Sequence, residues 1–120
     1  MKKKKILVVE DRESLQDVLK SRLQEAGYQV SIASTGAQGL KAVTKMKPDL
    51  IILDVMLPDA NGFDLCQKIK EMKRPFKVII YTGKLEAVDV QHARQVGADD
   101  FTVKTIDFKY LLASVAKLTA

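Results

Sequence analysis

Four short apolar runs constrain this chain most strongly, because polar and apolar residues do not alternate within them. The runs are ILVV (6–9), LIIL (50–53), VIIY (78–81) and FTV (101–103). Runs of this length and character are typical of strands buried on both faces, as in a parallel sheet. A fifth run, YQVSIA (28–33), does alternate, with Tyr28, Val30 and Ile32 on one face. That pattern predicts an edge strand.

Helical periodicity fills the segments between these runs. Apolar residues recur at helical spacing from Leu15 to Ala26, and Gly27 follows at the position of a C-terminal cap. Further helices are expected between a Thr35–Gln38 capping box and Pro48, from near Asn61 to Pro75, from about Leu85 to Val96, and after an N-cap at Asp107, with Leu111, Val115 and Leu118 on the apolar face. Strands and helices therefore alternate along the whole chain.

This alternation implies right-handed crossovers and an α/β fold, a doubly wound parallel sheet with helices on both faces. A chain of 120 residues without an internal repeat or linker is expected to form one domain, residues 1–120. Ligands of such sheets bind beyond the carboxyl ends of the strands. The residues that follow each strand are therefore the candidates for chemistry.

Composition limits the classes of partner. The net charge is +5, but Lys2 to Lys5 in the basic N-terminal leader (1–5) contribute four of these charges. The remainder indicates no nucleic-acid partner, and we expect no direct nucleic-acid binding. The sequence contains no run of about 18 apolar residues and no signal-peptide core, so we expect a cytoplasmic protein without a membrane contact. Cys66 is the single cysteine, which excludes an internal disulfide and predicts a packed helix residue.

Acidic, hydroxyl and ammonium side chains follow four of the five strands. They are Glu10 and Asp11, Asp54, Thr82 and Lys104. Taken one at a time, they have ordinary explanations: Asp11 would cap the first helix, and Thr82 would begin the fourth. Because parallel strands end at the same edge of a sheet, the whole set favours a common site.

Three carboxylates at one edge require a cation or protons. At an effective dielectric constant near 20, two such charges 4 Å apart repel by about 4 kcal/mol. Hard oxygen ligands without a nearby histidine favour Mg²⁺. With the acids neutralised, Asp54 becomes a candidate nucleophile for phosphoryl transfer, while Lys104 and Thr82 would contact the phosphoryl oxygens.

Four motifs carry a resemblance to a known family: ILVVEDRESL, PDLIILDVMLPDANGFDL, VIIYTG and GADDFTVK. In this order and spacing they resemble the receiver domains of two-component response regulators, including the stand-alone chemotaxis type. The resemblance covers essentially the whole chain. It implies a flavodoxin-like five-stranded sheet with strand order 2-1-3-4-5.

The resemblance also implies roles for individual residues. Asp54 would accept a phosphoryl group from a histidine kinase or a histidine phosphotransfer protein. Asp11 and Asp54 would bind Mg²⁺ directly, Met56 would bind it through its backbone carbonyl, and Glu10 through water. Lys104 would contact the phosphoryl group.

The resemblance further implies a switch. Thr82 would be drawn toward the added phosphoryl group, vacating space into which Phe101, three residues before the family's lysine, would turn. An alternative is that Phe101 is a permanently buried strand aromatic. The signal would be read by a downstream protein or effector domain on the surface of the fourth helix, fifth strand and fifth helix, and dimerisation on activation is left open.

The sequence departs from the family's usual pattern near this surface. Thr105 stands where the family has a proline after the lysine, and a cis bond before a residue other than proline costs about 2.5 to 4 kcal/mol. We therefore expect a trans Lys104–Thr105 bond and a rearranged loop. Gly83 replaces an alanine, and Lys109 and Tyr110 occupy positions that are often acidic.

Two alternatives to a phosphorylated signalling module remain. A pseudo-receiver would keep the fold and act without phosphate, and Thr105 is the main support for it. A small phosphohydrolase would use an aspartyl phosphate, but such chemistry usually places a second acid two residues after the nucleophile, where this chain has Met56. We expect a module that catalyses its own phosphorylation and dephosphorylation, not an enzyme with a free substrate.

Overall fold

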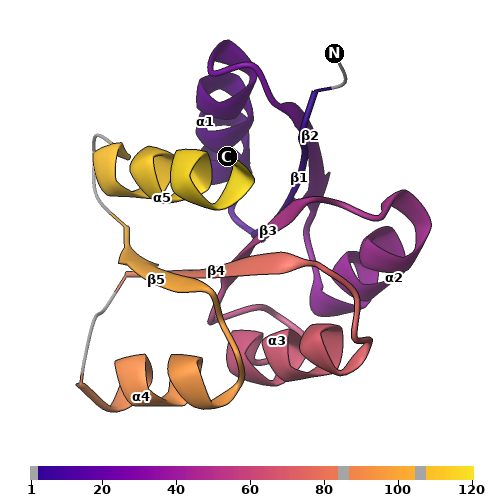
Figure 1. The fold of residues 1–120 in the computed structure, drawn as a ribbon, viewed down its shortest axis with the longest axis vertical. Coiled ribbons are helices and arrows are strands. Elements are labelled where there is room, and N and C mark those ends of the chain that lie inside the picture. Colours follow the sequence, from indigo (N-terminus) through magenta and orange to yellow (C-terminus); the bar gives the residue numbers. More distant parts are fainter. Residues whose placement is uncertain (1–2, 84–86, 105–107) are drawn as a thin grey trace.

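The expected strands form one parallel sheet in the computed structural model, which describes residues 3–83, 87–104 and 108–120. They are β1 (Lys5–Val9), β2 (Gln29–Ala33), β3 (Leu50–Asp54), β4 (Lys77–Thr82) and β5 (Asp100–Val103). Their order in the sheet is β2-β1-β3-β4-β5 (Figure 1). The strand order 2-1-3-4-5 is therefore confirmed, and β2 lies at an edge as its alternating pattern predicted.

Helices cover both faces of this sheet. They are α1 (Glu13–Glu25), α2 (Gly36–Met46), α3 (Gly62–Glu71), α4 (Ala87–Gln95) and α5 (Lys109–Thr119). The helices α1 and α5 lie on one face, and α2, α3 and α4 lie on the other (Figure 1). Successive residues of a strand point to opposite faces of the sheet. The unbroken apolar runs therefore contribute side chains to two hydrophobic cores, one on each face.

Alternate residues of each strand belong to different cores. Ile6, Val8, Ile52 and Ile79 pack with residues of α1 and α5, whereas Leu7, Val9, Ile51 and Ile80 pack with residues of α2, α3 and α4. All eight side chains are at most 1% exposed. Val30 and Ile32 of β2, together with Tyr28 just before the strand, join the core under α1 and α5.

The helix caps are partly those expected from the sequence. Thr35 caps α2 by accepting a hydrogen bond from Gln38 N (3.1 Å). Asn61 caps α3 by accepting one from Phe63 N (2.8 Å). At α1 and α5, residues other than those considered from the sequence hold the N-cap position.

Arg12, not Asp11, holds the N-cap position of α1. Phe108 holds that of α5, with a φ of 57° in the left-handed region. Asp107 lies outside the described residues, as does the expected start of the fourth helix at Leu85.

Two residues without an expected chemical role are packed between helices. Cys66 is fully buried on α3, and its Sγ lies 3.7 Å from the Val96 carbonyl oxygen. Burial raises the pKa of the Cys66 thiol to about 11. His92 of α4 stacks on Phe63 with ring centroids 4.2 Å apart. Cys66 is thus the packed helix residue that the sequence predicted, and His92 is a half-buried residue that packs on Phe63.

Within the described parts of the chain, no helix combines the length and apolar character needed to cross a membrane.

Strand register aligns the carboxyl ends of the central strands. The pairs at this edge are Val9 with Leu53, Asp54 with Tyr81, and Thr82 with Val103. Glu10 and Lys104, which each follow a strand by one residue, therefore continue toward the same edge as Asp54. The backbone is held there, since Lys104 N donates to the Thr82 carbonyl at 2.7 Å.

Candidate functional site

The three acidic residues that follow β1 and end β3 lie together. Glu10, Asp11 and Asp54 each present a carboxylate oxygen, and these oxygens lie within 4.8 Å of one another. Glu10 is 2% exposed and Asp54 is 7% exposed, whereas Asp11 is exposed to solvent. Two of the three charges are thus removed from water. Repulsion between charges is stronger in the protein interior than in water. The site needs positive charge.

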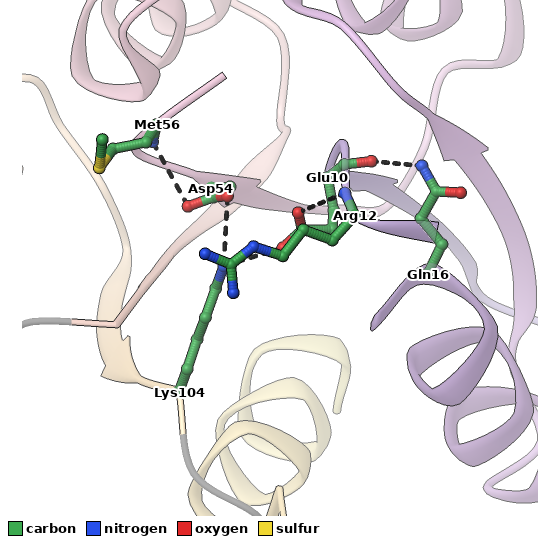
Figure 2. A network of polar contacts seen from close by, with 6 residues as sticks. All are labelled: Glu10, Arg12, Gln16, Asp54, Met56 and Lys104. Carbon is green, nitrogen blue, oxygen red and sulfur yellow. Dashed lines mark hydrogen bonds and ion pairs between the residues drawn. The ribbon is translucent and has the colours of Figure 1, made fainter. Parts of the chain in front are cut away.

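Lys104 supplies one positive charge from the end of β5. Its Nζ lies 2.9 Å from Glu10 Oε1 and 3.2 Å from Asp54 Oδ2, and its side chain is 16% exposed (Figure 2). The contact of Lys104 with Asp54 agrees with the prediction made from the residues at the strand ends. The closer contact with Glu10 was not foreseen. Lys104 therefore bridges two buried carboxylates.

Glu10 is held by several further bonds. Its Oε2 accepts a hydrogen bond from Arg12 N at 2.9 Å, and its own backbone N donates to the Ala33 carbonyl at 3.0 Å. Its carbonyl accepts a bond from the Gln16 side chain (Figure 2). Burial raises the pKa of Glu10 and outweighs the opposing hydrogen bond from Lys104. The carboxylate is thus fixed in place at an electrostatic cost.

The donor set fits a small divalent cation. Three carboxylates face a single lysine, so two negative charges are left unbalanced. Carboxylate oxygens are hard ligands, and no nitrogen or sulfur ligand belongs to this cluster of described residues. A divalent cation would balance the remaining charge.

The loop after Asp54 is folded tightly against it. Gly62 N donates to the Val55 carbonyl at 2.7 Å, and Met56 pairs with Asn61 in a short antiparallel bridge. A Cβ on Gly62 would lie 2.2 Å from the Asp54 carbonyl oxygen, so only glycine fits there. Met56 N lies 3.4 Å from Asp54 Oδ1 (Figure 2). The loop therefore fixes the position of the Asp54 backbone.

Asp59 ties the same loop to α2. Its Oδ1 accepts from Gly36 N at 2.7 Å and its Oδ2 accepts from Ala37 N at 3.1 Å. These two backbone hydrogen bonds hold the pKa of Asp59 below its ordinary value. The first-turn amide groups of a helix are otherwise without partners, so the carboxylate also stabilises α2.

Thr82 and Phe101, the residues expected to form a switch, lie on neighbouring strands. Thr82 ends β4 and is half-buried, and Phe101 lies on β5 and is also half-buried. Phe101 packs against the core under α2, α3 and α4 and lines surface hollows beside α4 and α5. Its ring is therefore only partly enclosed.

Tyr81 forms the wall beneath Lys104. Its ring is 2% exposed, and Lys104 Nζ lies 5.6 Å from the ring centroid, within range of a cation–π contact. Burial, with smaller contributions from the charges of Glu10 and Asp54, raises the pKa of Tyr81 to about 12. Its hydroxyl has no hydrogen-bond partner among the described residues.

Three of the four residues that depart from the family's usual pattern are exposed. Gly83 is exposed at the end of β4, and Lys109 and Tyr110 are exposed in the first turn of α5. Thr105 lies outside the described residues, so the expected trans Lys104–Thr105 bond stays a prediction.

Reasoning from the sequence missed three contributors: Arg12, Asp59 and Tyr81. The presence of an arginine directly after two acids was a signal for Arg12. Asp59 and Tyr81 had no comparable signal, because their contacts depend on the loop path and on side-chain packing.

Comparison with known proteins was consistent with this geometry. Residues 6–116 match the family described as "Response regulator receiver domain". The alkaline phosphatase synthesis transcriptional regulatory protein PhoP of Bacillus subtilis is 43% identical over 101 residues, which are 84% of this chain and 42% of that protein. The DNA-binding response regulator MtrA of Mycobacterium tuberculosis is 36% identical over 113 residues, 94% of this chain and 49% of that one. The chain thus spans about half the length of these relatives.

Solved structures resemble the whole chain. The response regulator TrrA of Thermotoga maritima, in complex with Mg(2+)-BeF, has a TM-score of 0.88 and 33% identity, with 96% of this chain and 98% of that chain covered. The chemotaxis protein CheY4 of Vibrio cholerae has a TM-score of 0.92 and 27% identity, with 98% and 99% covered.

Proposed function

We propose, since the chain belongs to the family of response regulator receiver domains, that Asp54 is its phosphoacceptor and that the acidic cluster holds Mg²⁺. The receiver domain is a signalling module of two-component systems. The observation that carries the assignment of Asp54 is its buried carboxylate beside two acids, with the Lys104 ammonium 3.2 Å away. Glu10 shares this environment, and the resemblance of the sequence to receiver domains distinguishes the two carboxylates by placing the phosphoacceptor at Asp54.

Asp11 and Asp54 would bind Mg²⁺ directly, the backbone carbonyl of Met56 would complete the protein ligands, and Glu10 would act through water. Bound there, the ion offsets negative charge on the acids and on the incoming phosphoryl oxygens. The complex of TrrA with Mg(2+)-BeF supports this for a relative of similar fold. Lys104 is already in place to contact the same oxygens.

The phosphoryl donor would be a phosphohistidine of a histidine kinase or phosphotransfer protein. One Asp54 carboxylate oxygen attacks phosphorus, the P–O bond forms, the P–N bond breaks, and the electron pair leaves with the imidazole. Lys104 and the Thr82 hydroxyl would donate to the phosphoryl oxygens, while Glu10 keeps Lys104 oriented. Hydrolysis of the aspartyl phosphate would restore the carboxylate, so the module would catalyse both steps itself.

The switch would use Thr82 and Phe101. Movement of the Thr82 hydroxyl toward a phosphoryl group on Asp54 would open space near β5. The partly enclosed ring of Phe101, which borders hollows beside α4 and α5, supports this reading, since such a ring has room to move. A downstream protein or effector domain would read the surface of α4, β5 and α5, and that surface is also the candidate for dimerisation.

The relatives bear on the partners. PhoP is named a transcriptional regulatory protein and MtrA a DNA-binding response regulator, and this chain spans about half of each. The expectation of no direct nucleic-acid binding is therefore not supported. We also propose that residues 1–120 form a single receiver domain, with residues 1–5 as a basic leader. We propose further that the protein acts in the cytoplasm.

The two alternatives have less support. A phosphorylation-independent pseudo-receiver would not require a lysine bridging two buried acids. A phosphohydrolase would require a second acid two residues after Asp54, where the side chain of Met56 is 80% exposed and uncharged.

Phosphorylation by a small donor tests the proposal. The protein is incubated with Mg²⁺ and acetyl phosphate, and its intact mass is measured. One added phosphoryl group is expected, absent in Asp54→Asn and present in Asp64→Asn, a control that replaces an exposed acid on α3. A folded wild-type protein that gains no mass would refute the proposed function.

A further inference from the structure

Arg12 occupies a position where its side chain does not stabilise the adjoining helix α1. It is the N-cap of α1, where Ser, Thr, Asp or Asn would be favoured, and its side chain makes no capping hydrogen bond. A positive charge is also unfavourable near the positive end of a helix dipole. The stability of α1 therefore does not explain an arginine here.

The side chain extends toward the candidate site. In Figure 2 it runs from the start of α1 across Glu10 in the direction of Asp54 and Lys104. Arg12 and Lys104 also line one surface hollow, whose wall includes Tyr81. Within the described residues, the guanidinium forms no ion pair with a carboxylate. It is an exposed cation without an anionic partner in that part of the chain, on a residue whose backbone amide contacts Glu10.

The charge of the site changes on phosphorylation. Before transfer, the three acids carry three negative charges, which Lys104 and a divalent cation balance. A phosphoryl group on Asp54 brings that residue to about two negative charges, so about one negative charge is left over. One further cation within reach would balance it.

We infer that Arg12 supplies this cation by binding the phosphoryl oxygens, so that it is a second phosphoryl-binding residue beside Lys104. The planar guanidinium presents paired N–H donors whose spacing matches two phosphate oxygens. The ammonium group of lysine has no such planar pair of donors. The inference rests on the proposed function of Asp54. Arg12 would therefore act in the phosphorylated state. In the metal-free protein, its positive charge would repel an incoming Mg²⁺ ion.

This role predicts opposite effects on two ligands. We would measure the Kd of Mg²⁺ alone, and the Kd of beryllium fluoride at saturating Mg²⁺, by titration calorimetry. Arg12→Ser introduces a favoured N-cap residue, so the variant should be at least as stable to heat as the wild type. We expect it to bind beryllium fluoride about two- to fivefold more weakly, the size of an exposed ion pair, and Mg²⁺ as tightly as the wild type or more tightly.

Matched variants separate charge from position. Arg12→Lys should retain part of the beryllium fluoride affinity, and Arg22→Ser, in the last turn of α1, should change neither Kd. Equal beryllium fluoride affinity in wild type and Arg12→Ser would overturn the role of Arg12 alone. Weaker Mg²⁺ binding in Arg12→Ser would overturn it as well, because it would indicate damage to the acidic cluster. A wild-type protein that binds no beryllium fluoride would instead count against the proposed function.

Discussion

Lys104 Nζ lies 2.9 Å from Glu10 Oε1, which joins the end of the last strand to the end of the first. Glu10 is 2% exposed and is itself held by the Arg12 amide. The lysine is therefore oriented before any phosphoryl group arrives. This lowers the cost of fixing a long side chain during transfer.

Removing this lysine should destabilise the metal-free protein. Lys104→Met leaves two buried carboxylates without their cation, and we expect a loss of about 1–3 kcal/mol in the free energy of unfolding. Because Mg²⁺ would offset the same charges, its addition should narrow the difference. Urea unfolding with and without Mg²⁺ measures both effects, with Lys20→Met on the exposed face of α1 as the control. Equal stability of Lys104→Met and wild type would contradict the bridging role.

Gly62 should tolerate no side chain. In Gly62→Ala the new Cβ would fall 2.2 Å from the Asp54 carbonyl oxygen, so the loop or the end of β3 must move. We expect a loss of about 1–3 kcal/mol in stability, together with slower phosphorylation. Gly83→Ala is the matched control, since a Cβ added at Gly83 would meet no described atom within 4 Å. Similar losses in both variants would show that the close approach to Asp54 is not the cause.

Asp59 should give a pH-dependent contribution. The pKa of its carboxyl is depressed in the folded state by the Gly36 and Ala37 amides, so its stabilisation is present above the ordinary value of 3.8 and is lost as pH falls through the lower folded value. Asp59→Ala should therefore be less stable than wild type at neutral pH, and the difference should shrink in acid. Thermal unfolding across pH checks this, with Asp17→Ala, at an exposed position of α1, as the control. A difference that stays constant with pH would exclude the ionised cap.

Tyr81 should be replaceable by phenylalanine. Its hydroxyl is buried without a partner among the described residues, so Tyr81→Phe removes an unsatisfied polar group and keeps the ring beneath Lys104. We expect stability to stay the same or to rise by up to about 1 kcal/mol. A clear loss in chemical denaturation would mean that the hydroxyl makes a bond of structural value.

Unbroken apolar runs and their alternation with helices are local patterns, so they predicted the parallel sheet and the residues at the strand ends. The strand order 2-1-3-4-5 was implied by the family resemblance. The sequence also predicted Thr35 and Asn61 at helix starts. It failed for Arg12 and Phe108, which hold N-cap positions against local preference. Contacts that depend on side-chain direction, such as Lys104 with Glu10, required the three-dimensional arrangement.

The most direct test of the central claim is the position of the phosphoryl group. After reaction with acetyl phosphate and Mg²⁺, borohydride reduction converts an aspartyl phosphate to homoserine, which peptide mass spectrometry can locate. We predict homoserine at position 54 and at no other acid. Homoserine at a different position, or none in a folded protein, would contradict the assignment of Asp54 as phosphoacceptor.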